Sequence, residues 1–483
     1  MGFGATLLAA ALPALEARRV PPRGLMIGPA ARWRGARRRH WLTFSVMALA
    51  ASAVVYLLGG QSLVAAFAAL FLLILGAAAL APAAVAALAR LLEVPARASG
   101  SPALIMAVRG LTAHLGRTGI AVAALAVAVA ASTGVALMID SFRTSVTDWL
   151  DGYLRADIYI SAVDRAGPGL DADFIDALGS LPGVTAVSLG RRFTAEDPVH
   201  GPLEIFVLDT TPEGFAGFQV KRGDADDLWR RFSRGGEVLV SEPFARRFDL
   251  APSDRFALAT DRGTVELEVA AVYYDYSSDR GVLAMSPATF ERYFDPRPWL
   301  TASLHVDEDA PGGTTAALSA FEGRLNRDGA WFARSNRDLK DASLVVFDRT
   351  FQVTGILRIL AVIVAVTGIV TALMALELER AREYATLRAV GVTRGGLAAQ
   401  VLAQTTLTGL AAGLIALPMG VALCVVLIEV INVRSFGWSM QTVVDPGLLL
   451  ATLLVAVAAA LAAGIYPAWR LRALVVAEGL RHD

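Results

Sequence analysis

The chain has 483 residues, of which 55% are hydrophobic and 18% are charged, and its formal net charge is zero. Soluble proteins carry about 25% charged residues, so this chain is short of charge. Residues 141–353 hold 57 of its 88 Asp, Glu, Lys and Arg residues, an uneven placement that excludes a single soluble globule. The composition indicates an α-helical integral membrane protein with one large water-exposed domain.

The first residues, 1–15, are apolar and end in small residues, but they lack the basic segment that begins a secretory signal. The segment Leu12-Pro-Ala-Leu-Glu-Ala-Arg-Arg is similar to Tyr466-Pro-Ala-Trp-Arg-Leu-Arg, and both follow Ala- and Leu-rich runs. We interpret residues 1–15 as the remnant of a preceding transmembrane helix, with a basic cytoplasmic linker at 16–41. A chance match between two Ala-rich helix ends is the alternative.

Six apolar stretches are long enough to cross a bilayer as a helix, which takes about 20 residues. They are approximately 42–58, 62–89, 118–139, 354–376, 397–431 and 447–467. The sequence Gly59-Gly60-Gln61 predicts a tight turn between the first two. Pro418, with Gly420 just after it, predicts a kink or a re-entrant break in the fifth.

The arginines predict the orientation of these spans. All 21 basic residues outside 141–353 are Arg, and 19 of them lie in 18–39, 90–117, 380–394 and 470–481. These segments are alternate loops of one six-span topology, and positive charge is concentrated in cytoplasmic loops. We therefore expect both termini and the 377–396 loop in the cytoplasm and residues 141–353 on the opposite side.

The segment 141–353 mixes strand and helix patterns. Alternation predicts strands at 157–163, 203–208, 237–240 and 264–274, and helices are expected at 174–181, 290–294 and 315–325. We predict an α+β domain with two subdomains and a β-rich part around 236–285. Cys424 is the one cysteine, so no intrachain disulfide can hold this domain together.

The two ends of this domain carry apolar stripes at helical spacing, each contiguous with a span. The stripe residues are Phe142, Val146, Trp149, Leu150 and Tyr153 at one end and Leu344, Phe347 and Phe351 at the other. We predict that two helices pack along these faces as a stalk, with Trp149 and Phe347 on facing helices. The alternative is that the domain simply begins and ends in packed helices.

Catalytic signatures are absent from the sequence. The lysines are Lys221 and Lys340, and neither stands in a phosphate-binding P-loop. The histidines are scattered, so a zinc site is not expected, and His200 and His305 are interpreted as surface residues. A membrane-bound enzyme is therefore disfavoured. Gly409 and Gly413 have the spacing that permits close helix packing, although this motif is weak in a chain so rich in Ala and Gly.

A charged segment, 377–394, follows the fourth span and is expected to form a short amphipathic helix that Gly391 ends. Its pattern Glu383-x-x-x-Leu387-Arg388-Ala389-x-Gly391 resembles the FtsX-like permease family of ABC transporters. The order of spans over 100–483 also resembles that family, and the large domain is similar to its MacB-like periplasmic core domain. The whole chain looks like the C-terminal half of a ten-span member. The resemblance leaves open whether it is a fragment, a frameshifted product, the product of a split gene or a complete product.

The resemblance implies this division of the chain: helix remnant 1–15, linker 16–41, two linking helices 42–92, linker 93–117, span 118–140, core domain with stalk ends 141–353, span 354–376, coupling helix 377–396, two spans 397–467 and cytoplasmic tail 468–483. It implies a multi-pass protein of the bacterial inner membrane. ATP and Mg would be bound by a partner P-loop ATPase dimer, with no cofactor in this chain and no nucleic acid. A second permease half would supply the missing spans.

By the same resemblance, the ATPase would contact the coupling helix through Glu379, Arg382, Glu383, Leu387, Arg388 and Gly391. Leu387 would fill an apolar notch in the ATPase. The motion would serve to export or extract a hydrophobic or amphipathic substrate such as a lipid, lipoprotein, peptide or drug. Alternatively, the chain transports nothing and transmits motion to an extracytoplasmic partner such as a cell-wall hydrolase.

Overall fold

The computed structural model describes residues 36–113, 115–164, 169–326 and 329–472. The expected helix remnant at 1–15 and most of the 16–41 linker lie outside these ranges. The chain divides into two compact units. The helical unit comprises Met1–Val135, Arg358–Leu423 and Asp445–Asp483, and the sheet unit comprises Ala136–Leu357 and Cys424–Val444.

The long helices are α2 (Ala36–Leu58), α3 (Leu63–Ala79), α4 (Ala81–Ala98), α5 (Pro102–Ala113), α6 (Leu115–Tyr153), α13 (Asn336–Ala389), α14 (Arg394–Val426) and α16 (Pro446–Arg472). Within the described residues, five stretches are long and apolar enough to cross a membrane: His40–Leu58, Leu63–Ala98, Val122–Tyr153, Arg394–Phe436 and Pro446–Tyr466. The remaining predicted span, 354–376, lies in α13, where most of its side chains are outside the described set.

The first turn is where the sequence predicts it. Gly60 has a φ of +51° between α2 and α3, and Ser45 and Ser52 of α2 donate to the carbonyls of Gly76 and Ala69 of α3, each at 2.7 Å. The predicted second span at 62–89 is not one uninterrupted helix. It is divided at Leu80, because Pro82 begins a new helix, α4.

Two further expectations are corrected. The segment 93–117, expected as a linker, contains the end of α4 and all of α5, and Ala107, Val108 and Leu111 lie in the helical core. Of the two alternatives expected at Pro418, the re-entrant break is wrong, because α14 continues through that residue to Val426. The helix departs from α geometry later, in the π-helical turn η3 (Leu427–Asn432), which precedes α15 (Val433–Phe436).

Small residues allow the helices of the helical unit to approach closely. A Cβ atom added to Gly409 would lie 2.8 Å from the carbonyl oxygen of Ala456, and one added to Gly413 would lie 2.7 Å from Leu453 Cδ1. Both contacts are with α16, so the Gly409-x-x-x-Gly413 motif marks a real helix crossing. Gly420 meets Thr133 of α6 in the same way, at 2.9 Å.

Ten strands of the described chain form one sheet in the order β10-β1-β9-β2-β3-β8-β5-β7-β4, with β6 paired to β7. The strands are β1 (Ile158–Ala162), β2 (Val184–Asp197), β3 (Gly201–Asp209), β4 (Val220–Arg222), β5 (Glu237–Ser241), β6 (Arg255–Thr260), β7 (Gly263–Tyr273), β8 (Val282–Met285), β9 (Thr301–Val306) and β10 (Trp331–Ser335). The α+β class is thus confirmed, and a tight turn at Asp261–Gly263 joins β6 to β7 in an antiparallel hairpin.

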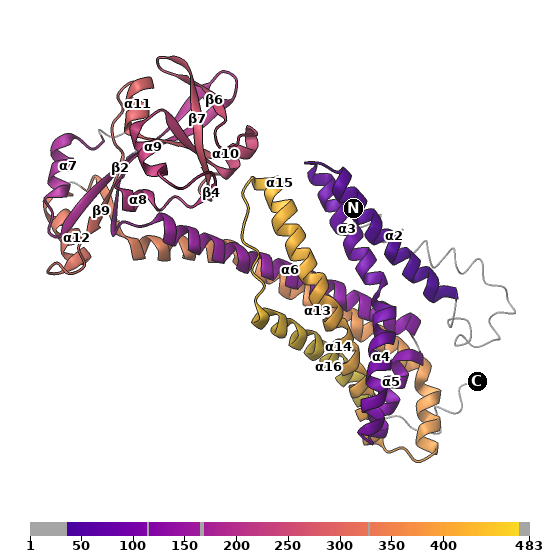
Figure 1. Cartoon of the computed structure of the whole chain (residues 1–483). Helices are drawn as coiled ribbons and strands as arrows, with labels where there is room; N and C mark the ends of the chain where they lie inside the picture. The colour runs from indigo at the N-terminus through magenta and orange to yellow at the C-terminus, as the bar shows by residue number, and fades with distance from the viewer. Residues whose placement is uncertain (1–35, 114, 165–168, 327–328, 473–483) are drawn as a thin grey trace. The chain divides into compact units, whose positions relative to one another are not determined.

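The sheet unit has two lobes with separate cores. In the first, α7 (Ala172–Gly179) and α12 (Gly313–Arg324) pack on β1, β2 and β9 around Leu178, Leu304 and Phe321 (Figure 1). The second contains β3 to β8 with α8 (Pro212–Phe215), α9 (Leu228–Arg234), α10 (Glu242–Arg247) and α11 (Pro287–Tyr293). Its segment 237–285 holds most of the strands, in agreement with the expected β-rich part.

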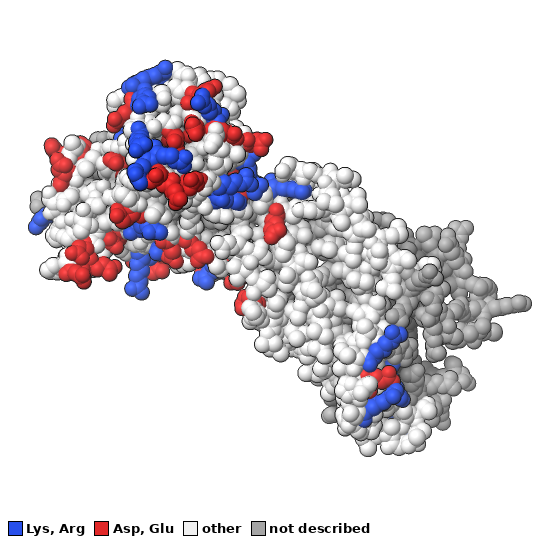
Figure 2. Space-filling model, viewed as in Figure 1, with Lys and Arg blue, Asp and Glu red and all other residues white. Residues whose placement is uncertain are grey.

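The two units differ in how many charged side chains they carry. Acidic and basic side chains are spread over the sheet unit, whereas the helical unit shows few (Figure 2).

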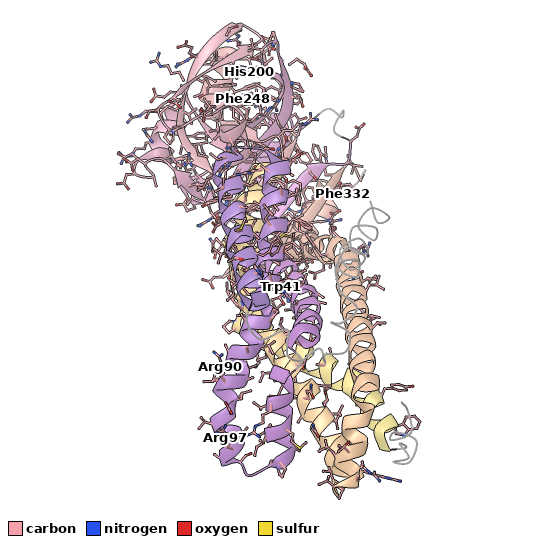
Figure 3. The ribbon with its side chains drawn as sticks, turned by 90° about the vertical axis from the view of Figure 1, so that its right-hand side faces the viewer. Trp41, Arg90, Arg97, His200, Phe248 and Phe332 are labelled. Atoms are coloured by element: carbon pink, nitrogen blue, oxygen red, sulfur yellow. The ribbon has the colours of Figure 1, made fainter. Side chains whose placement is uncertain are left out.

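His200 is not a surface residue as expected, because its ring is half-buried against Phe248 and Phe256 and its Nδ1 lies 2.9 Å from Asp197 (Figure 3). It serves the core of the second lobe.

Candidate coupling site

The end of α13 contains the segment for which the sequence predicts contact with an ATPase. It is not a separate short helix, since α13 is continuous from Asn336 to Ala389. Gly391 has a φ of +105°, its N–H donates to the carbonyl of Arg388 at 3.1 Å, and the N–H of Val392 donates to the carbonyl of Leu387 at 3.0 Å. These two bonds make a Schellman motif, which requires a glycine-like backbone at Gly391. The predicted helix stop is present.

Leu387 is occupied by contacts within the chain. It is half-buried and packs, with Val392, on a small core of α14 and α16 residues: Leu397, Ala398, Val401 and Ala468. An apolar contact between these two positions commonly accompanies a Schellman motif. The apolar side chain that this turn exposes is Val390, which is 81% accessible. Leu387 is therefore placed to hold the turn in position.

The charged residues of the segment are only partly described. Arg388 is half-buried, and its Nη1 has no hydrogen-bond partner among the residues that the structure describes. Glu379, Arg382 and Glu383 lie on α13, but their side chains fall outside the described set. Of these four charged residues, Arg388 is therefore the one whose side-chain environment the structure describes.

The stalk residues lie on two helices that run side by side within the sheet unit (Figure 1). The ring centroids of Phe142 on α6 and Phe347 on α13 are 5.2 Å apart, and Phe351 lies 5.9 Å from Phe142. Ion pairs flank the rings: Arg143 with Asp348 at 3.2 Å and Lys340 with Asp151 at 2.6 Å. Val146 and Leu344 of the same stripes are half-buried.

Trp149 has different neighbours from those expected. Its ring stacks on Tyr153 of the same helix at 5.2 Å and meets Tyr276 of the β7–β8 loop edge-on at 5.8 Å. Tyr153 in turn meets Phe218 at 6.4 Å. At the end of α6, Trp149 and Tyr153 thus pack on residues of the second lobe. Earlier in the same helix, Phe142 packs on α13.

A third chain segment joins the stalk and the second lobe. We call residues 424–444, which run from the end of α14 to the start of α16, the strap. Ser141 Oγ accepts from the N–H of Val443 at 3.0 Å, and Ser145 Oγ accepts from the N–H of Gln441 at 3.1 Å. Trp438 stacks on Phe142 at 6.4 Å. The strap therefore lies along α6 on the same face as the stalk aromatics.

A buried ionic cluster fixes the strap to the second lobe. Glu242, with its side chain 3% exposed, accepts from the N–H of Ser439 at 3.0 Å and from Lys221 Nζ at 2.6 Å. Arg246 Nε donates to the same carboxylate at 3.0 Å, and Tyr276 donates its hydroxyl proton to the carbonyl of Ser439 at 2.9 Å. Lys221 also contacts Ser439 Oγ. Burial raises the pKa of Glu242, but the bonds from Lys221 and Ser439 outweigh this and lower it.

The sequence did not predict this cluster. Lys221 has no neighbouring motif that marks it as part of a site, and Glu242 stands far from Ser439 along the chain. One signal was available: a lysine is rare in this chain, and Glu242 falls in the first turn of a helix, where a carboxylate is favoured. No group of three or more His, Cys, Asp or Glu that could hold a metal ion occurs in the described parts of the chain.

Comparisons with known proteins find two family models, a relative and a solved structure that are similar to parts of this chain. A model of the FtsX-like permease C-terminal domain matches residues 355–476, and a model of the MacB-like periplasmic core domain matches residues 118–319. An uncharacterized ABC transporter permease protein of Mycobacterium tuberculosis is 35% identical over 497 residues, covering 100% of this chain and 57% of the relative. The periplasmic region of MacB from Actinobacillus actinomycetemcomitans is 12% identical with a TM-score of 0.31, covering 40% of this chain and 94% of that one. The chain spans little more than half the length of its mycobacterial relative.

Proposed function

Because this chain belongs to the FtsX-like permeases that carry a MacB-like periplasmic core domain, we propose that it is the permease subunit of an ABC transporter. The chain has no P-loop, so a separate ATPase dimer would bind ATP and Mg and supply the energy. A second permease half would complete the membrane part, consistent with the greater length of the mycobacterial relative.

The observation that carries this proposal is the joining of three chain segments within the sheet unit. The stalk parts of α6 and α13 are held together by Phe142, Phe347 and the Arg143–Asp348 ion pair. The strap is bound to α6 through Ser141 and to the second lobe through Glu242. A displacement of any one segment would therefore be passed to the others, which suits a device that converts motion of membrane helices into motion of a water-exposed domain.

We propose that the ATPase engages the turn at the end of α13. Val390 provides the exposed apolar contact, Arg388 provides charge, and Leu387 and Gly391 hold the turn in shape. Glu379, Arg382 and Glu383 would line the same helix toward the partner. Apolar anchors usually dominate such interfaces, while charges at the rim contribute less.

Co-purification with the ATPase tests this assignment. Val390→Glu should weaken association at least about tenfold, because it places a charge at the anchor. The matched control is Val199→Glu, at a valine that is 83% exposed on the turn between β2 and β3. Association unchanged by Val390→Glu, or weakened equally by Val199→Glu, would contradict the proposed contact.

The substrate class is proposed as hydrophobic or amphipathic: a lipid, lipoprotein, peptide or drug. The alternative is a subunit that transports nothing and switches an extracytoplasmic partner such as a cell-wall hydrolase. ATP-dependent release of lipid or drug from reconstituted vesicles would support transport. A stable complex between the sheet unit and a hydrolase, with no such release, would support the alternative.

A further inference from the structure

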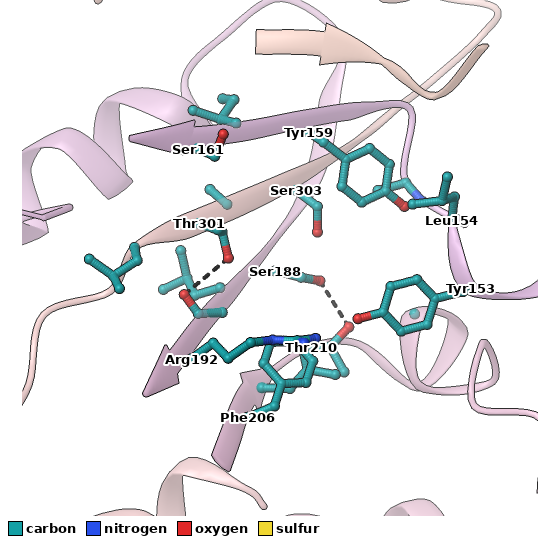
Figure 4. Close-up of a pocket in the computed structure, with 18 of the residues that line it drawn as sticks. Tyr153, Leu154, Tyr159, Ser161, Ser188, Arg192, Phe206, Thr210, Thr301 and Ser303 are labelled. Atoms are coloured by element: carbon teal, nitrogen blue, oxygen red, sulfur yellow. Dashed lines mark hydrogen bonds between the residues drawn. The ribbon is translucent and has the colours of Figure 1, made fainter. Parts of the chain in front are cut away.

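A cavity of about 720 Å³ lies on the open face of the first lobe (Figure 4). Strands β1 and β9 alternate strictly: Ile158, Ile160 and Leu304 face the core under α7 and α12, so the residues between them face the other way. No described helix of the first lobe covers that second face. The volume is typical of small-molecule sites, which span about 300–1,000 Å³.

Side chains from four neighbouring strands form the floor of the cavity in registered rows. Arg334, Tyr159, Ser303 and Ser188 are successive cross-strand partners from β10 to β2. The next row contains Phe332, Ser161 and Thr301. Figure 4 shows Ser161, Ser188 and Ser303 projecting into one space. Each row thus places a charged or aromatic group beside hydroxyl groups.

Several of these polar groups have no partner of their own. Within the described residues, the hydroxyls of Ser161 and Ser303 and the ring of His305 make no hydrogen bond. Arg334 makes neither a hydrogen bond nor an ion pair through its side chain in the same set. Polar groups that converge on a cavity without partners are available to a ligand.

The charge of the lining is positive. Arg192 and Glu204 pair with each other at 2.8 Å and so cancel. Arg155 and Arg334 line the same cavity, and neither is in an ion pair among the described residues. Aromatic surface lies beside them: Phe332 is 55% exposed, and the guanidinium of Arg192 lies 5.0 Å from the ring centroid of Phe206. This combination favours an acidic group attached to an apolar group.

We propose that this cavity binds a small amphipathic molecule with one phosphate or carboxylate group. Arg334 would bind the acidic group, Ser161 and Ser303 would donate to it, and Phe332 and Tyr159 would pack on the apolar part. The wall of the cavity includes Tyr153 and Leu154 at the end of α6 and Leu339 near the start of α13. A bound ligand would thus contact the ends of the two stalk helices. The proposal that binding affects the stalk rests on the proposed permease function, whereas the binding itself does not.

Binding can be measured without any ATPase. The full chain in phosphatidylcholine nanodiscs is titrated calorimetrically with octyl phosphate or octanoate, with empty nanodiscs as the blank. Octyl glucoside and inorganic phosphate serve as probes that each lack one half of the proposed ligand. We expect saturable binding of at least one octyl acid, with the ratio of the two affinities identifying the preferred acidic group, and binding at least about tenfold weaker for the other two probes.

Two variants and a control locate the site. Arg334→Ala should weaken octyl acid binding about tenfold or more, and the loss should shrink at high salt. Ser161→Trp should abolish binding by filling the cavity from an exposed position. Arg337→Ala, an exposed arginine nearby that does not line the cavity, should bind like the wild type. Unchanged binding in Arg334→Ala, or octyl glucoside bound as tightly as the acids, would overturn the proposal, whereas ATPase results would not bear on it.

Discussion

Glu242 is the residue on which the strap and the second lobe meet. Its carboxylate accepts from Lys221, from Arg246 and from both the N–H and the hydroxyl of Ser439. A buried carboxylate is stable only when its oxygens are satisfied in this way. The cluster therefore joins the strap to the second lobe through charge-assisted bonds, which depend on the geometry of every partner.

Removing the charge of Glu242 should loosen this attachment. We expect Glu242→Gln to destabilise the sheet unit by about 1.5–3 kcal/mol, since hydrogen bonds between charged groups are lost and the half-buried Lys221 loses its counter-charge. Glu266→Gln is the control, because Glu266 is 66% exposed in its ion pair with Arg255 and should contribute under about 1 kcal/mol. The apparent midpoint of thermal unfolding reports both. Equal effects of the two variants would contradict the role given to Glu242.

The same comparison has a predicted pH dependence. The pKa of Glu242 is lowered in the folded chain from its ordinary value of 4.5. The unfolded chain thus binds the proton more readily, and the stabilisation is complete above pH 4.5 and is lost as the pH falls below it. The stability difference between wild type and Glu242→Gln should shrink in that acid range.

At the level of single residues, the sequence predicted features that depend on neighbouring residues better than contacts between residues far apart in the chain. The stop at Gly391 was predictable because one glycine after a charged helix fixes a local backbone conformation. The burial of Leu387 was not, because its partners Val401 and Ala468 come from other helices. The Glu242 cluster was missed for the same reason.

Among the elements, the contact between α6 and α13 followed from the spacing of their aromatic residues, whereas much of the sheet could not be predicted. Stripes at helical spacing marked α6 and α13, since a helix repeats its own pattern. The longest strand, β2, was missed because its ends pair with different partners, β9 and β3, and its burial follows both rather than one alternation. The spacing also could not show that Trp149 packs on Tyr276, a residue of a distant loop.

The stalk contacts predict which changes uncouple the molecule. Under the proposed function, Phe347→Ser should abolish the substrate-stimulated part of ATP turnover, because it removes a ring that lies 5.2 Å from the ring of Phe142 and 4.6 Å from that of Phe351. Such aromatic pairs contribute about 0.5–1.5 kcal/mol each beyond their buried area. Trp149→Ser should act similarly through Tyr153 and Tyr276. The control is Val346→Ser, at a neighbouring residue that is 66% exposed. If substrate stimulates ATP turnover in both aromatic variants as it does in the wild type, the stalk contacts are not needed for coupling.

For the whole molecule, composition and charge were sufficient to predict the class of protein, a membrane protein with one large water-exposed domain. The separation of charged and apolar residues along the chain predicted a membrane part and a water-exposed domain, and the structure divides the chain close to those limits. The arrangement of the sheet was beyond such reasoning, because its order brings β10 beside β1 from opposite ends of the domain. Pairing at that distance leaves no trace in local periodicity.

The arginine distribution makes a prediction about the membrane topology of the whole chain. Nineteen of the 21 basic residues outside 141–353 lie on alternate loops, which places the sheet unit outside the cytoplasm and the end of α13 inside. Cys424 is the one cysteine and is buried, so a Cys424→Ala background accepts single engineered thiols with little disturbance.

Two exposed positions distinguish the two sides. Thr264, at the β6–β7 hairpin, and Ala389, at the end of α13, are both exposed. In intact cells, an impermeant maleimide should label Thr264→Cys, whereas Ala389→Cys should be labelled only after the membrane is opened. Labelling in the reverse order would overturn the topology and, with it, the assignment of the α13 turn to a cytoplasmic ATPase. The Glu242 cluster and the cavity would remain, since both lie wholly within the sheet unit and do not depend on which side of the membrane it occupies.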